Sequence, residues 1–149
     1  MKRDIFTPHE ADQVRKIAHL LQGLKTSVAM MTTLDESGRM HSRPMLLQKD
    51  RFDGNLWFFS DDSSQKIAEL RWNRQVLFTC FDAQHPNFIT IAGTAQVTRD
   101  KVRAKALWTA EHPAWFPKGP EDPDLILIKV EVDRVESWKP AYQKIELAG

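Results

Sequence analysis

The spacing of hydrophobic and polar residues along the chain predicts a mainly β protein with three helices. Alternating or continuous apolar runs favour strands, whereas apolar residues at every third or fourth position favour a helix. Strands are expected over residues 27–33, 40–48, 55–60, 75–81, 88–99 and 125–138. Helices are expected over residues 8–22, 64–72 and 101–108. Six strands joined mostly by short turns favour an antiparallel barrel over a doubly wound sheet.

Capping residues mark where these helices begin. Thr7 is followed by Pro8 and, three residues after Thr7, by Glu10, the pattern of a capping box with proline in the first turn. Asp62 and Gln65 have the same spacing and predict a second capping box, and Asp100 predicts the N-cap of the third helix. The tail after residue 138 has little periodicity, so no element is expected there.

Glycine and proline indicate the shape of the predicted sheet. Gly38 ends a polar turn between the first two strands, where a hairpin loop commonly needs positive φ. Pro44 cannot donate a ladder hydrogen bond, so its strand should lie at an edge or be distorted. Gly93, in the middle of the fifth strand, predicts a bulge or the close approach of another backbone.

Composition narrows the classes of protein to be considered. A chain of 149 residues with 42% hydrophobic content suits one domain, residues 1–149. Its 21 basic and 20 acidic residues nearly cancel, which argues against nucleic acid or an anionic membrane as the main partner. The single cysteine, Cys80, excludes an intramolecular disulfide and suits a reducing cytoplasm. With neither a signal peptide nor an apolar run long enough to span a membrane, we expect a soluble cytoplasmic protein.

The residues from 41 to 66 carry the most promising chemistry. Arg43 sits among apolar residues in a predicted strand, where a charge is costly unless it is paired. Ser60, Ser63, Ser64 and Lys66 cluster where an aromatic strand meets a helix N-terminus, and helix N-termini favour phosphate. We therefore expect Arg43 and Lys66 to face the same anion. The residues alone predict a phosphate-bearing, aromatic ligand.

The sequence gives no support for a metal site, a reactive cysteine or a catalytic pair of carboxylates. The five histidines lack the spacing of metal ligands, so no metal site is expected. Cys80 lies in a predicted buried strand with no neighbouring base, and is interpreted as an inert thiol. Asp61 and Asp62 stand beside the expected phosphate and are interpreted as caps or solvent-facing residues.

One connection differs from the short turns elsewhere. Residues 112–124 contain four prolines around Trp115 and Phe116, and prolines stiffen a loop by fixing φ. Two interpretations remain open. The aromatic side chains cover a ligand or partner, or they fold back as a lid on the core of their own domain.

Four segments give the sequence a family resemblance. RPMLLQ (43–48), FFSDDSSQK (58–66), IAGTA (91–95) and WFPKGPEDPDL (115–125) resemble the pyridoxamine 5′-phosphate oxidase-like superfamily, and most closely its bacterial general stress protein branch. The resemblance extends from about residue 17 to residue 138. It implies a six-stranded split β-barrel that forms a homodimer and holds FMN at each end of the interface.

The resemblance also implies roles for individual residues. Arg43 would touch the flavin phosphate or ribityl chain, and Lys66 would bind the phosphate. Trp115 and Phe116 would be added around the flavin ring by the second subunit. The full set of FMN-binding residues implied is Arg43, Pro44, Met45, Leu46, Phe59, Ser60, Ser64, Gln65, Lys66, Trp115 and Phe116.

Departures from the oxidases bear on the activity. Gln48 and Gln65 replace basic residues of the oxidases, and the chain ends about ten residues after Trp138, without their arginine-containing C-terminal segment. Oxidation of pyridoxamine phosphate is therefore not expected. Three functions remain open: an FMN-dependent oxidoreductase acting on an unidentified small molecule, a non-catalytic flavin-binding or flavin-sensing protein, and an interaction module. No catalytic side chain is identified.

Overall fold

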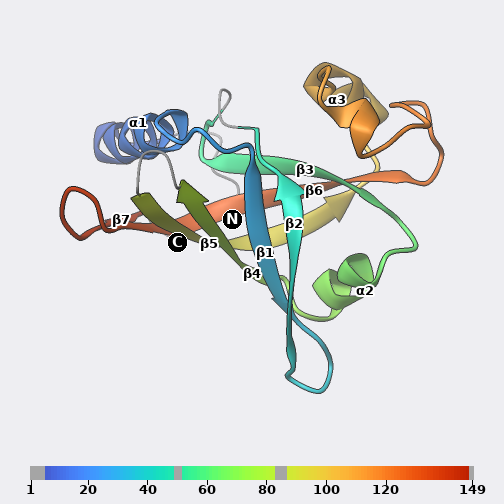
Figure 1. The fold of residues 1–149 in the computed structure, drawn as a ribbon, viewed down its shortest axis with the longest axis horizontal. Coiled ribbons are helices and arrows are strands. Elements are labelled where there is room, and N and C mark those ends of the chain that lie inside the picture. Colours follow the sequence, from blue (N-terminus) through green and yellow to red (C-terminus); the bar gives the residue numbers. More distant parts are fainter. Residues whose placement is uncertain (1–5, 49–51, 83–86, 148–149) are drawn as a thin grey trace.

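A single antiparallel sheet organises the chain (Figure 1). The computed structural model describes residues 6–48, 52–82 and 87–147. The strands are β1 (Val28–Leu34), β2 (Met40–Leu46), β3 (Asn55–Asp61), β4 (Gln75–Asp82), β5 (Asn87–Thr98), β6 (Leu125–Ser137) and β7 (Gln143–Glu146). The helices are α1 (Pro8–Gln22), α2 (Gln65–Trp72) and α3 (Lys101–Leu107), with a short 3₁₀ helix, η1 (His112–Ala114).

The sheet order is β2-β1-β4-β5-β6-β3, with β7 paired to the second half of β6. The antiparallel, mainly β fold and the six expected strands are confirmed, and β7 is an additional strand. Among the described residues no ladder joins β2 to β3, the two ends of this order. The sheet is therefore an open form of the split barrel, with α1 beside β7 at one end and α3 at the other (Figure 1).

The helix caps agree with the sequence at two of three places. The capping box between Thr7 and Glu10 is present, and Asp100 accepts a hydrogen bond from the backbone N–H of Arg103. The predicted box of Asp62 and Gln65 is wrong, because Ser64 is the N-cap of α2 and its side chain makes no cap hydrogen bond. The Asp62 carboxylate instead pairs with Arg71 and Arg99.

The expectations for glycine and proline hold. Gly38 has a φ of 78° in the β1–β2 turn, and Pro44 lies in β2, the end strand of the sheet order. At Gly93 the β5–β6 register shifts, and an added Cβ would lie 2.5 Å from the backbone oxygen of Glu131. Both a bulge and a close backbone approach are therefore present.

Two hydrophobic clusters lie on opposite sides of β3. The main core contains Phe58, stacked on Phe78 with ring centroids 4.7 Å apart, together with Ile17 and Leu21 of α1. The second cluster is built on Phe59 and Leu127 and is covered by Ala104 and Leu107 of α3. Because alternate residues of a strand face opposite sides, consecutive phenylalanines in β3 serve both clusters.

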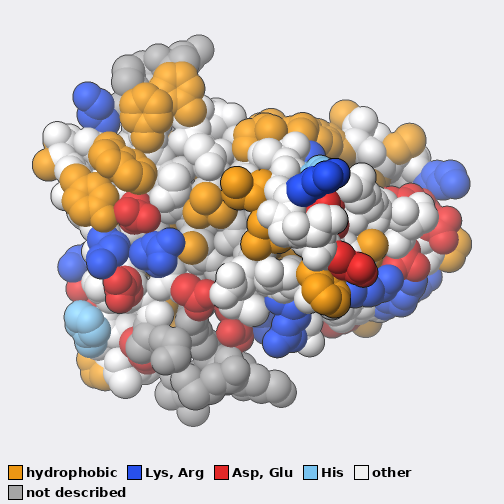
Figure 2. Space-filling view, turned by 90° about the horizontal axis from the view of Figure 1, so that it is seen from below, with side chains coloured by type: hydrophobic (Ala, Val, Ile, Leu, Met, Phe, Trp, Pro, Cys, Tyr) orange, Lys and Arg blue, Asp and Glu red, His pale blue; other side chains and the backbone are white. Residues whose placement is uncertain are grey.

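The outward face of β2, β1, β4 and β5 carries no charged side chain. Burial alternates along these strands, and the register places the following outward residues together: Met40, Ser42, Pro44, Leu46, Val28, Met30, Thr32, Leu34, Gln75, Leu77, Thr79, Phe81, Phe88, Thr90, Ala92 and Thr94. Phe81 and Phe88 are exposed and stack on each other. We call this set the uncharged face. In a view from below, exposed hydrophobic side chains gather in groups beside charged ones (Figure 2).

Among the described residues, no helix is both long and apolar enough to cross a membrane.

Candidate functional site

A pocket of about 290 Å³ lies where β2 and β3, the two ends of the sheet order, come near each other. Its walls are Arg43, Pro44, Met45, Leu46, Phe59, Lys66, His112, Trp115 and Phe116. Eight of these nine residues are in the set implied by the resemblance, and His112 is the addition. Segments separated by more than 70 positions in the sequence thus meet around one space.

Lys66 provides a cation to this pocket. Its Nζ donates to Ser60 Oγ at 3.0 Å, and Ser60 Oγ lies 3.2 Å from Ser64 Oγ. No carboxylate among the described residues lies within 4.0 Å of this ammonium group. Burial lowers the pKa of Lys66, and the positive charge of Arg43 lowers it further. An anionic group bound in the pocket would offset both effects on the pKa of Lys66, because an opposite charge favours the protonated amine.

Arg43 forms an ion pair with the buried carboxylate of Glu69. Its Nη2 lies 2.7 Å from Oε1 of Glu69 in α2, and its Nη1 donates to the hydroxyl of Thr33 at 2.7 Å. Burial raises the pKa of Glu69, but hydrogen bonds from Thr33, Gln65 and Arg43 outweigh it and keep the pKa below its ordinary value. Among the described residues the Nε–H of Arg43 donates to no acceptor. The guanidinium is thus fixed by an ion pair while it keeps a donor for a ligand.

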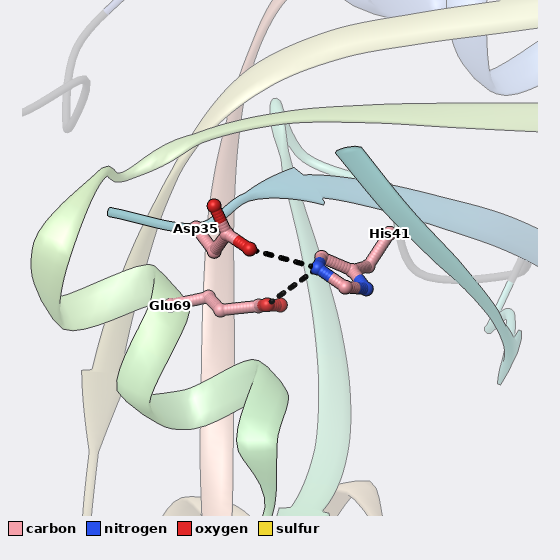
Figure 3. Close-up of side chains that lie close together, drawn as sticks. All are labelled: Asp35, His41 and Glu69. Atoms are coloured by element: carbon pink, nitrogen blue, oxygen red, sulfur yellow. Dashed lines mark hydrogen bonds and ion pairs between the residues drawn. The ribbon is translucent and has the colours of Figure 1, made fainter. Parts of the chain in front are cut away.

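Glu69 also belongs to a cluster with Asp35 and His41 (Figure 3). Nε2 of His41 lies 3.0 Å from Oδ2 of Asp35 and 3.7 Å from Oε2 of Glu69. Asp35 and His41 come from the two sides of the β1–β2 hairpin, so spacing in the sequence did not reveal this group. Both oxygens of Glu69 already receive protein donors, namely Arg43, Thr33 and Gln65. We therefore interpret the cluster as the support of Arg43 rather than as a metal centre.

The proline-rich loop lines the pocket of its own chain. Phe116 packs against the second cluster with its ring centroid 6.1 Å from that of Phe59, while Trp115 remains 41% exposed. The loop therefore folds back on a core of its own domain, and the cover of a ligand or partner stays a prediction. The resemblance implies that Trp115 and Phe116 act across a subunit interface, and this stays a prediction. Within the chain, both residues line the same pocket as Arg43 and Lys66.

Three residues of the implied FMN-binding set do not line the pocket, namely Ser60, Ser64 and Gln65. Ser60 is buried and supports Lys66 together with Ser64. Gln65 donates to Oε2 of Glu69 at 3.1 Å, and so supports Arg43 indirectly. Gln48, the other departure from the oxidases, donates to the backbone oxygen of Leu107 at 2.6 Å and joins the segment after β2 to the end of α3.

His112 was missed because the histidines were considered only as metal ligands. Its side chain is 2% exposed, and its ring centroid lies 4.6 Å from that of Phe59 and 5.1 Å from that of Trp108. The signal available in the sequence was its place in the loop, three residues before Trp115.

Comparison with known proteins identifies the relatives of this arrangement. A model of the family described as pyridoxamine 5′-phosphate oxidase like matches residues 12–148. The chain belongs to this family. No protein with a curated description matches it.

Solved structures of other bacterial proteins have the same fold. General stress protein 26 from Bacillus anthracis is 23% identical with a TM-score of 0.71, over 91% of this chain and 98% of that one. A general stress FMN/FAD-binding protein from Xanthomonas citri is 29% identical with a TM-score of 0.69, over 91% and 95%. A heme-binding protein from Mycobacterium smegmatis is 16% identical with a TM-score of 0.68, over 95% and 60%. Proteins of this fold are thus described as binding FMN or FAD in one case and heme in another.

Proposed function

We propose that this member of the oxidase-like family binds FMN in the pocket between β2 and β3. The observation that carries the proposal is a half-buried, unpaired Lys66 at the edge of a pocket with aromatic and apolar walls. Lys66, Ser60 and Ser64 would hold the phosphate, with the free donor of Arg43 beside them. Pro44, Met45 and Leu46 would lie along the flavin ring, with Phe59, Trp115 and Phe116 enclosing it. The 29% identical relative described as binding FMN or FAD supports this assignment.

The residues of the pocket suit a cofactor that carries its own chemistry. Bound FMN would supply hydride or single-electron transfer, while the protein supplies binding, orientation and electrostatics. Lys66 and Arg43 would fix one end of the cofactor, and the aromatic wall would exclude water from the other. We accordingly propose an FMN-dependent oxidoreductase acting on a small molecule, with a non-catalytic flavin-binding protein as the alternative. Loss of the flavin absorbance on addition of reduced nicotinamide, followed by turnover with an acceptor, would distinguish the oxidoreductase.

We also propose that two copies of the chain associate through the uncharged face. Exposed apolar side chains commonly mark an interface. Leu34, Met40 and Leu77 of this face line a hollow of about 370 Å³, which Asp133 and Arg134 also line. Pro44 and Leu46 belong both to the uncharged face and to the pocket wall. A second subunit seated there would therefore border the flavin.

The phosphate assignment is tested by comparing FMN with riboflavin, which lacks the phosphate. The parent protein should bind FMN more tightly than riboflavin in a fluorescence titration. Lys66→Gln should weaken FMN binding about thirtyfold or more, since truncating one partner of a desolvated charge pair costs about 2 kcal/mol or more. Riboflavin affinity should change little, because the ring contacts are left intact.

Lys16→Gln is the matched control, because Lys16 lies on α1, is 58% exposed and forms an exposed pair with Asp12. It should bind both flavins as the parent does. Undiminished FMN affinity in Lys66→Gln would show that the phosphate lies elsewhere. Absence of FMN binding by the parent would overturn the proposed function.

A further inference from the structure

His112 is the one residue of the pocket wall that the flavin assignment leaves without a role. It begins η1, directly before the proline-rich segment that carries Trp115 and Phe116. Its side chain is almost fully buried, yet it lines the pocket. A buried imidazole needs hydrogen-bond partners for its two nitrogens, so the partners of Nδ1 and Nε2 decide what the ring can do.

Nδ1 has its partner within the protein. The backbone N–H of Thr109 donates to Nδ1 at 2.8 Å, and the hydroxyl of Thr109 lies 3.0 Å from the same nitrogen. A backbone N–H can only donate, so Nδ1 must be the acceptor. In the neutral ring the proton is then on Nε2.

Packing fixes the orientation of the ring. The indole of Trp108 stacks on it with an angle of 28° between the planes, and Phe59 meets it edge to face at 77°. Burial lowers the pKa of His112, and the backbone of Thr109 and the nearby Glu111 carboxylate oppose this only in part. The ring is therefore neutral at pH 7, with a defined tautomer and a defined orientation.

Nε2–H has no acceptor among the described residues, since every hydrogen bond of the ring within them goes to Nδ1. We propose that His112 is a ligand-contacting residue whose Nε2–H donates a hydrogen bond to an acceptor on the flavin ring. This inference rests on the proposed function. The acceptor would be a carbonyl oxygen or an unprotonated ring nitrogen, because His112 stands with the aromatic side chains of the pocket and Lys66 with the serines. A donor in that place would increase flavin affinity and shift the flavin absorption spectrum.

Substitution of His112 by asparagine or by glutamine distinguishes the role of Nδ1 from that of Nε2. His112→Asn places its amide near Nδ1, where it can accept from Thr109, but it has no group at the position of Nε2. His112→Gln reaches the position of Nε2 and can donate there. We expect His112→Asn to lose about five- to tenfold in FMN affinity, the value of one neutral hydrogen bond. It should also lose the spectral shift of bound FMN, and His112→Gln should recover part of both.

Thermal unfolding of the apo variants shows whether either substitution acts through folding. A measurement on the unaltered protein avoids substitution altogether. With isotope-labelled histidine, the nuclear magnetic resonance signal of the His112 Nε2–H should move on FMN binding, while Nδ1 remains an acceptor.

The outcomes distinguish this inference from the flavin assignment. FMN binding by the parent, with affinity and spectrum unchanged in His112→Asn, would overturn the role of His112 and leave the proposed function intact. An unmoved Nε2–H signal in the FMN-bound parent would do the same. A parent that binds no FMN would overturn both.

Discussion

Arg43 shows how one residue can serve the fold and the site together. In the sequence it is a charge among apolar residues, which predicts a partner of opposite charge but does not say whether this is a ligand or a side chain. The structure supplies Glu69 at 2.7 Å, with 19% of the Arg43 side chain and 5% of the Glu69 side chain exposed. Removing either partner would leave the other charge buried without its counterion.

Replacing Arg43 should therefore weaken the fold as well as the site. We expect Arg43→Met to lower the free energy of unfolding of the apoprotein by about 1.5–3 kcal/mol, because Glu69 would lose a charged hydrogen bond. Combining it with Glu69→Leu should restore part of this loss, giving a coupling energy of about 0.5–3 kcal/mol. Urea unfolding of the parent, both single variants and the double variant measures the cycle.

Arg15→Met is the control for this cycle, because its pair with Asp12 is 71% and 49% exposed and should contribute little. If Arg43→Met were as stable as the parent, the Arg43–Glu69 pair would have no structural importance. The same variant titrated with FMN reports separately on the site.

The residues near position 66 were identified from sequence because their chemistry is local. Ser64 and Lys66 lie on a single strand–helix junction, so their proximity follows from chain connectivity. Glu69 was not identified, because it reaches the site through packing of segments far apart in the sequence, and His112 was not identified, because the histidines were considered only as metal ligands. Glu69 looks like an ordinary helix residue until the hairpin bearing Arg43 is placed against it.

At the scale of elements, the period-2 pattern of apolar residues identified the six longer strands, and the helical pattern identified the three α-helices. β7 was missed because its four residues contain a single buried side chain, Ile145, which is too short a pattern to detect. The capping box predicted for α2 was wrong for a different reason. Asp62 and Gln65 have the spacing of a capping box, but two arginines compete for the Asp62 carboxylate.

Gly93 connects one residue to the geometry of a whole strand pair. A Cβ at this position would lie 2.5 Å from the backbone oxygen of Glu131 and 2.7 Å from Cγ1 of Val130. Gly93→Ala would have to move β6, so we expect a loss of about 1–3 kcal/mol in the free energy of unfolding. Denaturant unfolding checks this value.

Gly23→Ala is its matched control, because the nearest atom to a Cβ there is the backbone oxygen of Leu20 at an ordinary 3.4 Å, and φ is −72°. That variant should stay within about 0.5 kcal/mol of the parent or gain stability. Equal stability of both variants would show that β6 adjusts freely at the bulge.

At the scale of the whole molecule, the uncharged face and the pocket share strand β2. The sequence predicts a homodimer from the aromatic residues of the proline-rich loop, and this stays a prediction; in the structure these residues line the pocket of their own chain. The uncharged face lies across four strands, where only the register brings the side chains together. No single segment of the sequence could have revealed it.

We expect this face to form the dimer interface, with flavin binding linked to dimerisation. Leu77 is exposed near its centre, paired with Thr32 on one side and Ala92 on the other. Leu77→Glu would place a charge in the interface without a partner, which costs several kcal/mol when it is desolvated. Light scattering should find the parent dimeric at micromolar concentration and the variant monomeric. Val102→Glu is the control, because Val102 is 81% exposed on α3 and lies away from this face.

Linkage makes a second, independent measurement possible. A ligand that binds the dimer better than the monomer must stabilise the dimer, so FMN should lower the concentration at which the parent dissociates. Leu77→Glu should correspondingly bind FMN more weakly although it alters none of the pocket residues. A parent that is monomeric at micromolar concentration and binds FMN fully would show that one chain forms the whole site. A monomeric variant with undiminished FMN affinity would show that dimerisation and flavin binding are independent, because Pro44 and Leu46 would then hold their side of the pocket without a neighbour.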